Sequence, residues 1–444
     1  MAAFLLVSAP LVRGGNRPLA LLVLECAGLV GLAAIAWSRG GGASASPALP
    51  ATLRWGLGLL LAIPLLQLVP LPASWWTALP GHEPYQRVLA IAGGGGEWRP
   101  LTINPAATEY AALALIPCVA IFFAVRALPR RRVRALALVF VGVAVAEAAL
   151  GILQVGVGKD SILALGNPFA GGAATGTYVN RNHFAGLMAM ALPILLAFWA
   201  VETLPPVDER GERLREHPRH ADARLARRIA WSLAIVLLLA ALLFTRSRAG
   251  IGCGLAAFAA ASLGLVWNAG SLRVRVLLGT MAALALLLAG YAGLTPILER
   301  FAPGDLALSY EGRLRIAAAA VRGGLEFLPF GSGLGTFADV FRRYQSEGLT
   351  GFIDHAHNDY AEAFLEMGVA GIAVIALLAI AYLARWGAIA GRRLPRTLGY
   401  LQVSAGFALL ALAAHGAFDF NFHIPANAIF FAFLAGVFFY DPPR

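Results

Sequence analysis

Apolar residues fill long uninterrupted blocks of this chain, and the polar residues gather between the blocks. Most blocks hold about 17–25 residues, the length that an α-helix needs to cross the hydrocarbon core of a bilayer. The pattern therefore predicts membrane-spanning helices. They lie near residues 18–37, 55–71, 111–128, 135–156, 185–203, 229–245, 250–267, 277–293, 358–384, 399–419 and 425–440, with residues 2–12 as a candidate for one more short span.

The composition supports the same class of protein. Hydrophobic residues make up 59% of the 444 residues, and charged residues make up 13%, about half of their usual share in soluble domains. We therefore expect an all-α, polytopic integral membrane protein with about eleven or twelve transmembrane helices. Cys26, Cys118 and Cys253 lie in apolar stretches, without metal-ligand or disulfide spacing. The first residues, MAAFLLVSAPLVRGG, lack the pattern of a cleaved signal peptide.

Basic residues are unevenly divided between the loops on the two sides of the predicted membrane domain. They are about three times denser in loops 38–54, 129–134, 204–228, 268–276 and 385–396 than in loops 72–110, 157–184, 246–249, 294–357 and 420–424. Loops rich in Lys and Arg stay in the cytoplasm, so the second set should face outside. The net charge of +11 then reflects membrane topology, and we expect no nucleic-acid partner.

The predicted helices and loops divide the chain into four parts. These are N-terminal spans with the first external loop (1–110), central spans (111–293), a large external loop (294–357) and C-terminal spans (358–444). In the large loop, SYEGRLRIAAAAVRGGLEF predicts a helix, PFGSGLG breaks the chain, and TFADVFRRYQ predicts a second helix capped by Thr336. No predicted strand precedes GSGLG, so we interpret it as a tight turn and not as a nucleotide-binding loop.

Polar residues of several external loops fall on the same side of the membrane. Ionisable groups near membrane spans are costly and usually mark a function. The candidates are Asn180, Asn182 and His183 in GTYVNRNHFAG, Arg246 and Arg248 in FTRSRAG, Arg313, Arg315, His355 and His357 in the large loop, and His415 and Asp419 in HGAFDFNFHIP.

Simpler interpretations of three of these clusters remain open. The Asn180–His183 group could cap the next helix. Arg246 and Arg248 could anchor the chain in lipid headgroups. His415 and Asp419, four positions apart, share a helical face and could either pack helices together or act in catalysis.

The densest cluster, HAHNDYAEAFLE, directly precedes an apolar span. Asp359, Glu362 and Glu366 fall on one face of a helix. Histidines and acids can bind a divalent metal, but no further spacing completes a site, so we expect no metal. His357 suits a general base, because an imidazole that titrates near neutral pH can take a hydroxyl proton. Arginine forks bind phosphate oxygens, so the external face predicts transfer of a group from a lipid pyrophosphate to a hydroxyl.

Four segments, in order over residues 150–380, resemble the bacterial O-antigen ligase and polysaccharide polymerase family. GTYVNRNHFAGLMAMALPILLA resembles its Asn-x-Asn-His segment, and LLFTRSRAGI resembles its Ser-Arg-Gly turn, with Ala249 in place of Gly. GRLRIAAAAVRGGLEFLPFGSGLGTF is similar to its external-loop arginine followed by a Gly-x-Gly element. HAHNDYAEAFLEMGVAGI resembles its His-Asn signature with a trailing Glu-x-Gly.

The resemblance implies a multi-pass, GT-C-like glycosyltransferase of the bacterial plasma (inner) membrane with its active face in the periplasm. Such an enzyme uses an undecaprenyl-pyrophosphate-linked glycan donor, needs no metal or other cofactor, and inverts the anomeric carbon. His357 would then be the base, and Arg313 and Arg248 would contact the pyrophosphate. The remaining expected substrate-binding residues are Arg246, Arg315, Asn180, Asn182, His183, His355, Asn358, Glu366, His415 and Asp419.

The acceptor separates the activities that the resemblance allows. A polymerase extends a glycan, a ligase uses the lipid A core, and a protein O-oligosaccharyltransferase uses a protein. The C-terminal HGAFDFNFHIPANAIFFA resembles the tail of exopolysaccharide polymerases, which favours the polymerase. Two other classes remain as alternatives: a transporter of anionic solutes, with polar groups at mid-membrane, and a receptor or scaffold, which needs no convergence of His and Arg.

Overall fold

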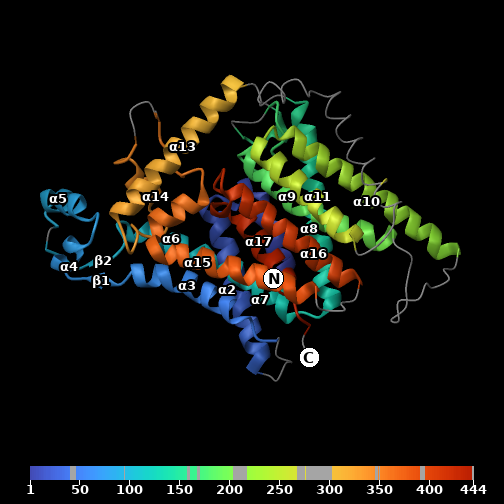
Figure 1. Ribbon diagram of the computed structural model, residues 1–444, viewed down its shortest axis with the longest axis horizontal. Helices are drawn as coiled ribbons and strands as arrows, with labels where there is room; N and C mark the ends of the chain where they lie inside the picture. Colours follow the sequence, from blue (N-terminus) through green and yellow to red (C-terminus); the bar gives the residue numbers. More distant parts are fainter. Residues whose placement is uncertain are drawn as a thin grey trace.

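The computed structural model is an all-α molecule with one very short pair of strands (Figure 1). It describes residues 1–40, 47–94, 96–157, 161–167, 171–203, 218–267, 276, 303–345, 349, 351–390 and 396–442. The span predicted at residues 277–293 lies outside the described residues.

The membrane helices in this part of the chain agree with the predicted apolar blocks. Eight are long and apolar enough to cross a membrane: Pro18–Ser38, Pro105–Ala127, Arg130–Val155, Arg181–Thr203, Ala221–Phe244, Arg248–Leu265, Asp359–Ala390 and Thr397–Gly416. Three further apolar helices are shorter: Ala2–Leu11, Ala51–Gln67 and Pro425–Phe438. The first of these has 10 residues, a rise of about 15 Å, so it is too short to cross the bilayer alone.

The helices are labelled in Figure 1 by their order in the chain. Those that form the membrane domain are α1 (Ala2–Leu11), α2 (Pro18–Gly40), α3 (Ala51–Gln67), α6 (Pro105–Leu113), α7 (Leu115–Ala127), α8 (Arg130–Val155), α9 (Arg181–Thr203), α10 (Pro218–Phe244), α11 (Arg248–Trp267), α15 (Asp359–Ala390), α16 (Arg396–Gly416) and α17 (Pro425–Phe438).

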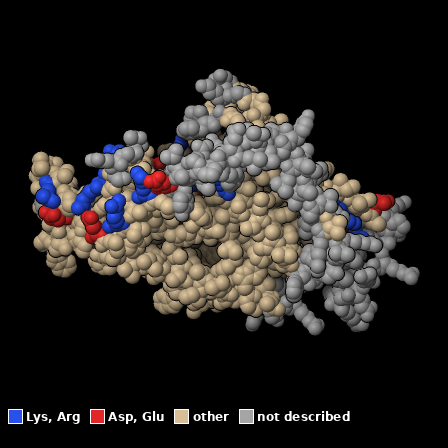
Figure 2. Space-filling model, turned by 45° about the horizontal axis from the view of Figure 1, so that its top comes forward, with Lys and Arg blue, Asp and Glu red and all other residues tan. Residues whose placement is uncertain are grey.

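Helix α9 is the centre of the molecule. Within its apolar window 94% of the residues are buried, against 28% in α15. It packs against α10, α11 and α16, and small residues along it permit close contact between the helices. A Cβ on Gly254 of α11 would come within 3.3 Å of Ala189 Cβ. Helix α9 is thus enclosed by protein, whereas α15 leaves most of its surface for lipid. A wide band without charged residues, visible in Figure 2, suits contact with lipid.

The helices outside the membrane domain confirm most of the predicted structure of the large loop. Helix α13 (Pro303–Glu326) carries Arg313 and Arg315, and the short α14 (Phe337–Phe341) follows the break. Thr336 occupies the N-cap position of α14, as predicted, but its side chain makes no capping hydrogen bond. Its hydroxyl donates instead to the carbonyl of Gly333 and lies 2.7 Å from Ser332 Oγ.

A second unit outside the membrane domain precedes α6. It consists of α4 (Ala73–Ala78), α5 (Glu83–Ile91) and the antiparallel pair β1 (Pro70–Leu71) and β2 (Arg99–Pro100), at the left of Figure 1. His82 joins this unit to the end of α13, since its ring lies 5.7 Å from the ring of Phe327.

Helix α15 is interrupted where the chain after α13 approaches it. Gly368 has a φ of +56°, which suits glycine, and a Cβ there would lie 2.2 Å from the carbonyl oxygen of Pro329. Gln67 of α3 donates to the carbonyl of Glu366 at 2.8 Å and accepts from Leu334 N. The turn predicted at PFGSGLG therefore packs against the kink in α15.

Candidate functional site

The carboxylate of Asp419 is the point where the predicted site residues meet. Asp419 lies in the loop between α16 and α17 and is fully buried. Its Oδ1 lies 3.5 Å from His357 Nδ1 and 3.7 Å from His183 Nε2, and its Oδ2 lies 3.6 Å from Arg313 Nη1. Asn182 Nδ2 donates to Oδ2 at 2.5 Å. Three segments far apart in the chain thus contact one carboxylate.

The ring of Phe420 orders the histidines around Asp419. It stacks on His355 with ring centroids 4.2 Å apart, and it meets the edges of His183 and His357 at 4.6 and 5.1 Å. An apolar ring at this place fixes the orientation of three imidazoles and excludes water from one side of each. His357 still exposes 27% of its side chain, and Arg313 exposes 32%. A substrate can therefore reach both of them.

Helix ends position these side chains. Asn180 precedes α9 and accepts from Asn182 N at 2.8 Å, and Asn358 precedes α15 and accepts from Tyr360 N at 3.1 Å. Both asparagines therefore act as helix caps. Asn358 also donates to the carbonyl of Ala417 at 3.0 Å, which joins the start of α15 to the loop that carries Asp419.

The charges around Asp419 keep it ionised. Burial by itself would raise the pKa of this carboxyl group, but the rings of His183 and His357 and the guanidinium of Arg313 outweigh burial and hold the pKa well below its ordinary value. A permanently charged carboxylate beside His357 Nδ1 favours the tautomer with its proton on Nδ1. The other nitrogen, Nε2, is then left as an acceptor.

A second cluster of acids and histidines lies beside the first. His423, in the turn Asn421–His423, has Nδ1 3.0 Å from Asp359 Oδ1 and Nε2 3.3 Å from Glu362 Oε1. Glu362 Oε1 is also 2.8 Å from His355 Nδ1. Burial alone would lower the pKa of His423, but the carboxylates of Glu362 and Asp359 outweigh it and raise the pKa to about 10. The two carboxylates therefore favour the imidazolium form of His423.

His355, Glu362 and His423 could together hold a metal ion, since one ligand atom of each lies within 4.8 Å of the others. His and Glu are suitable ligands for Zn²⁺. Each of these atoms already has a partner in the protein, because Glu362 Oε1 faces both rings. These contacts are those of an ion-pair cluster of two histidines and a carboxylate. The expectation of no metal stays a prediction.

Some predicted substrate-binding residues have other partners. Arg315 pairs with Glu311 on the exposed side of α13. Glu366 is 1% exposed and accepts from Phe337 N at 2.9 Å, which holds α14 to α15. Neither side chain contacts Asp419 among the interactions that the structure describes for them. Their assignment to a substrate therefore stays a prediction.

The turn with Arg246 and Arg248 lies at the same end of the bundle. Arg246 has a φ of +54°, and its guanidinium lies against Gly172. Arg248 begins α11, where Gly250 packs beside His415: a Cβ on Gly250 would lie 3.3 Å from His415 Cε1. His415 is fully buried, so in this structure it contributes to packing near the site and not to an open surface.

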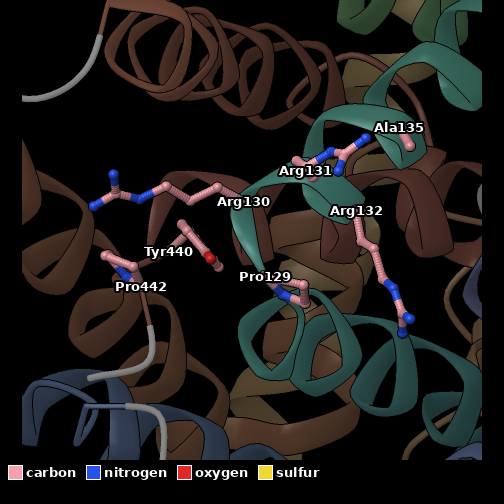
Figure 3. Close-up of a pocket in the computed structure, with 7 residues that line it drawn as sticks. All are labelled: Pro129, Arg130, Arg131, Arg132, Ala135, Tyr440 and Pro442. Atoms are coloured by element: carbon pink, nitrogen blue, oxygen red, sulfur yellow. The ribbon is translucent and has the colours of Figure 1, made fainter.

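A cavity of about 870 Å³ lies at the opposite end of α8. It is lined by Pro129, Arg130, Arg131, Arg132, Ala135, Tyr440 and Pro442. Figure 3 shows that the guanidinium groups of the three arginines point in different directions. In this arrangement the three side chains do not converge on one phosphate group, so we do not assign the pyrophosphate-linked donor to this cavity.

Sequence reasoning did not assign a role to His423, Phe420 or Glu362. Glu362 appeared only as part of an acidic helical face, and His423 only within the quoted segment HGAFDFNFHIP. The sequence does show two acids three positions apart, Asp359 and Glu362. It does not show that His423 contacts them, because His423 is 64 positions away from Asp359. A pattern within one segment cannot show such a contact.

Comparison with known proteins agrees with the family that the motifs indicated. Residues 233–376 match the family model described as O-antigen ligase. The matched range includes Arg246, Arg248, Arg313 and His357 and ends before Asp419. None of the curated proteins matches the chain significantly. The match supports an O-antigen ligase-like family and a membrane enzyme that transfers glycans.

Proposed function

We propose that this multi-pass membrane protein, with its O-antigen ligase-like domain, moves a glycan from undecaprenyl pyrophosphate to a hydroxyl acceptor on the periplasmic side of the plasma membrane. The observation that carries the proposal is the meeting of His357 and Arg313 at Asp419. A base and a phosphate-binding cation are the two groups that this transfer requires.

In the proposed reaction His357 is the general base. Its Nε2 takes the proton of the acceptor hydroxyl, and the acceptor oxygen forms a bond to the anomeric carbon. The bond from that carbon to the phosphate oxygen breaks, and its electron pair leaves with undecaprenyl pyrophosphate. Attack opposite the leaving group inverts the anomeric configuration. The imidazolium of His357 then releases its proton to water.

The cations of the site would stabilise the leaving group. Arg313 contacts Asp419 through Nη1, and its partly exposed guanidinium offers further N–H donors to phosphate oxygens. Arg248, at the start of α11, is proposed as a second contact. Asp419 orients His357 and balances the charge of Arg313. In the proposed complex both residues are therefore held in place before the substrate arrives.

We propose the polymerase as the activity, with the O-antigen ligase as the alternative. The support is the C-terminal segment HGAFDFNFHIPANAIFFA, which resembles that of exopolysaccharide polymerases and supplies both Asp419 and His423. Purified protein in vesicles, given lipid-linked glycan alone, should produce a ladder of longer glycans. A ladder that forms only after lipid A core is added would favour the ligase.

The mechanism predicts that His357→Ala and Arg313→Ala each reduce glycan transfer by roughly 10²–10⁴-fold, because each removes a group that acts in the transition state. Arg322→Ala serves as the control, because this exposed arginine lies on the same helix as Arg313. Product formation is measured on gels, and folding is checked by size-exclusion chromatography. Normal transfer by either site variant would contradict the mechanism.

A further inference from the structure

We propose that His423 is a positioning residue: its imidazolium, shared between two buried carboxylates, holds the segment with His357 against the segment with Asp419. The effect on turnover rests on the proposed function, whereas the effect on the two segments does not. His423 lies beside the catalytic pair and acts on it through the backbone on either side.

The position of His423 favours a charged ring. Its Nδ1 is hydrogen-bonded to Asp359 Oδ1 at 3.0 Å, and its Nε2 lies 3.3 Å from Glu362 Oε1. The two acids are 5% and 1% exposed. A ring between two buried carboxylates is stabilised as imidazolium, which presents an N–H and positive charge to both of them. Two carboxylates buried side by side would repel each other without this cation, because burial weakens their screening by water.

On one side, the cluster fixes the backbone that carries His357. Glu362 Oε2 accepts from Ala356 N at 2.7 Å, directly before His357. Asn358, directly after it, caps α15. His357 itself has a φ of +50°, a left-handed conformation that non-glycine residues rarely adopt. Such a conformation persists only where its surroundings determine it. The contact of Glu362 with Ala356 is one of those determinants.

On the other side, the cluster holds the segment that carries Asp419. Phe422 N approaches Asp359 Oδ2 at 3.4 Å, and the ring of His423 lies in the same turn. The ring of His355, bonded to Glu362, stacks on Phe420. Because His423 is hydrogen-bonded to Asp359 and ion-paired with Glu362, its removal loosens both segments at once. The distance between His357 Nδ1 and Asp419 then ceases to be fixed.

The test compares three purified variants in lipid vesicles. His423→Gln keeps a hydrogen-bonding side chain but removes the charge. We expect turnover to fall roughly 10–100-fold, as small misplacements of catalytic groups do, with the KM for the lipid-linked donor unchanged. Hydrogen–deuterium exchange should increase in peptides that cover residues 353–358 and 417–424.

The double variant Asp359→Asn/His423→Gln is the second arm. It replaces the ion pair by a neutral hydrogen-bonded pair, so it should recover part of the lost turnover and part of the protection from exchange. If His423→Gln does not fold, recovery of folding in the double variant tests the same pairing. A double variant that is worse than the single one would overturn the proposal.

His82→Gln is the matched control. The two ring nitrogens of His82 lie 2.9 and 2.8 Å from the carbonyls of Pro80 and Leu101, in the unit that contains α4 and α5. Loss of this doubly bonded histidine should leave turnover and exchange at residues 353–358 unchanged. Equal effects of both substitutions on those readouts would show that His423 supports folding only.

Two further results separate the possibilities. If wild-type protein transfers no glycan but His423→Gln still increases exchange in both segments, the proposed function fails and the positioning role stands. If elemental analysis finds one bound metal per wild-type chain that is lost in His423→Gln, the ring is a ligand and the proposal is overturned.

Discussion

Asp419 shows how one buried carboxylate can organise several donors. It accepts from Asn182 and from the backbone N–H of Phe420, and it faces two histidines and one arginine. An ionised group is stable at a buried place only when it is paired and hydrogen-bonded, and each of these neighbours meets part of that need. The carboxylate therefore sets the positions of the groups that surround it.

Asp419→Asn should preserve the shape of the side chain and remove its charge. His357 then loses the anion at Nδ1, and Arg313 loses its counter-ion. We expect turnover to fall roughly 10²–10⁴-fold, because an orienting acid fixes the tautomer of its histidine. Steady-state kinetics with the lipid-linked donor measure the effect, and thermal unfolding checks the fold. A variant with wild-type turnover would exclude Asp419 from the site.

The pKa of His423 predicts a dependence of stability on pH. Asp359, Glu362 and His355 face its ring. The pKa rises from 6.5 to about 10 on folding. The stability that this group contributes is therefore fully present below pH 6.5 and is lost as the pH rises through about 10.

The dependence can be measured as the unfolding temperature of the protein in detergent between pH 6 and pH 10. This is roughly the range between the unfolded and folded pKa values of His423. The wild-type protein should lose stability along this range, and His423→Gln should lose less. Parallel curves for the two proteins would mean that His423 is not charged in the fold.

At the scale of the elements, helix α8 holds the segment that leads into α9 through hydrogen bonds. Gln154 donates to the carbonyls of Leu163 and Gly176, both at 2.8 Å, and accepts from Thr175 Oγ1. Glu147 of the same helix accepts from Thr177 N at 2.9 Å. Polar groups inside a membrane helix need such partners. These bonds determine where Asn182 and His183 enter the site.

Glu147→Ala removes an acceptor from Thr177, whose backbone N–H is then left without its partner. We expect a loss of roughly 1–3 kcal/mol of stability and slower transfer, because the start of α9 is displaced. Chemical unfolding and product formation measure the two effects. Gly142→Ala is the control on the same helix, since no atom lies within 4 Å of the added Cβ. Equal stability of the two variants would contradict the role of Glu147.

For the whole molecule, the two ends of the helix bundle have different chemistry. The end with Asp419 holds the histidine and carboxylate clusters. At the other end, Arg385 binds Asp441 at 3.0 Å and the carbonyl of Tyr440 at 2.8 Å, and Tyr440 donates to the carbonyl of Leu128. Arg385, near the end of α15, and Leu128, directly before α8, therefore lie at the same end of the bundle, the end that the charge pattern predicts to be cytoplasmic.

Orientation can be tested with single cysteines in a variant that lacks the three native ones. Phe352→Cys lies five positions before His357 at a position 65% exposed, and Arg131→Cys lies at the opposite end in an exposed first turn of α8. A membrane-impermeant maleimide should label only the first in intact spheroplasts and both after permeabilisation. The reverse pattern would place His357 in the cytoplasm and contradict the proposed donor.

The sequence by itself determined the membrane class, the positions of most helices, and the polar segments that carry the chemistry. These features depend on the length of an apolar run or on neighbours a few positions away, so they can be read locally. The prediction of helices near Arg313 and after residue 358 was correct for this reason. Thr336 was likewise placed correctly at the start of α14, although its hydroxyl donates to the carbonyl of Gly333 and makes no hydrogen bond to the helix.

Only the tertiary structure decided which polar residues meet. Asn182 and Asp419 are 237 positions apart, and Arg313 is 105 positions from the carbonyl of Phe418. Helix packing around α9 brings these segments together, and it turns Arg315 away while its neighbour Arg313 reaches the carboxylate. Which of two arginines in one helix faces a remote acid depends on the position of the whole helix, and no pattern within the helix contains that information.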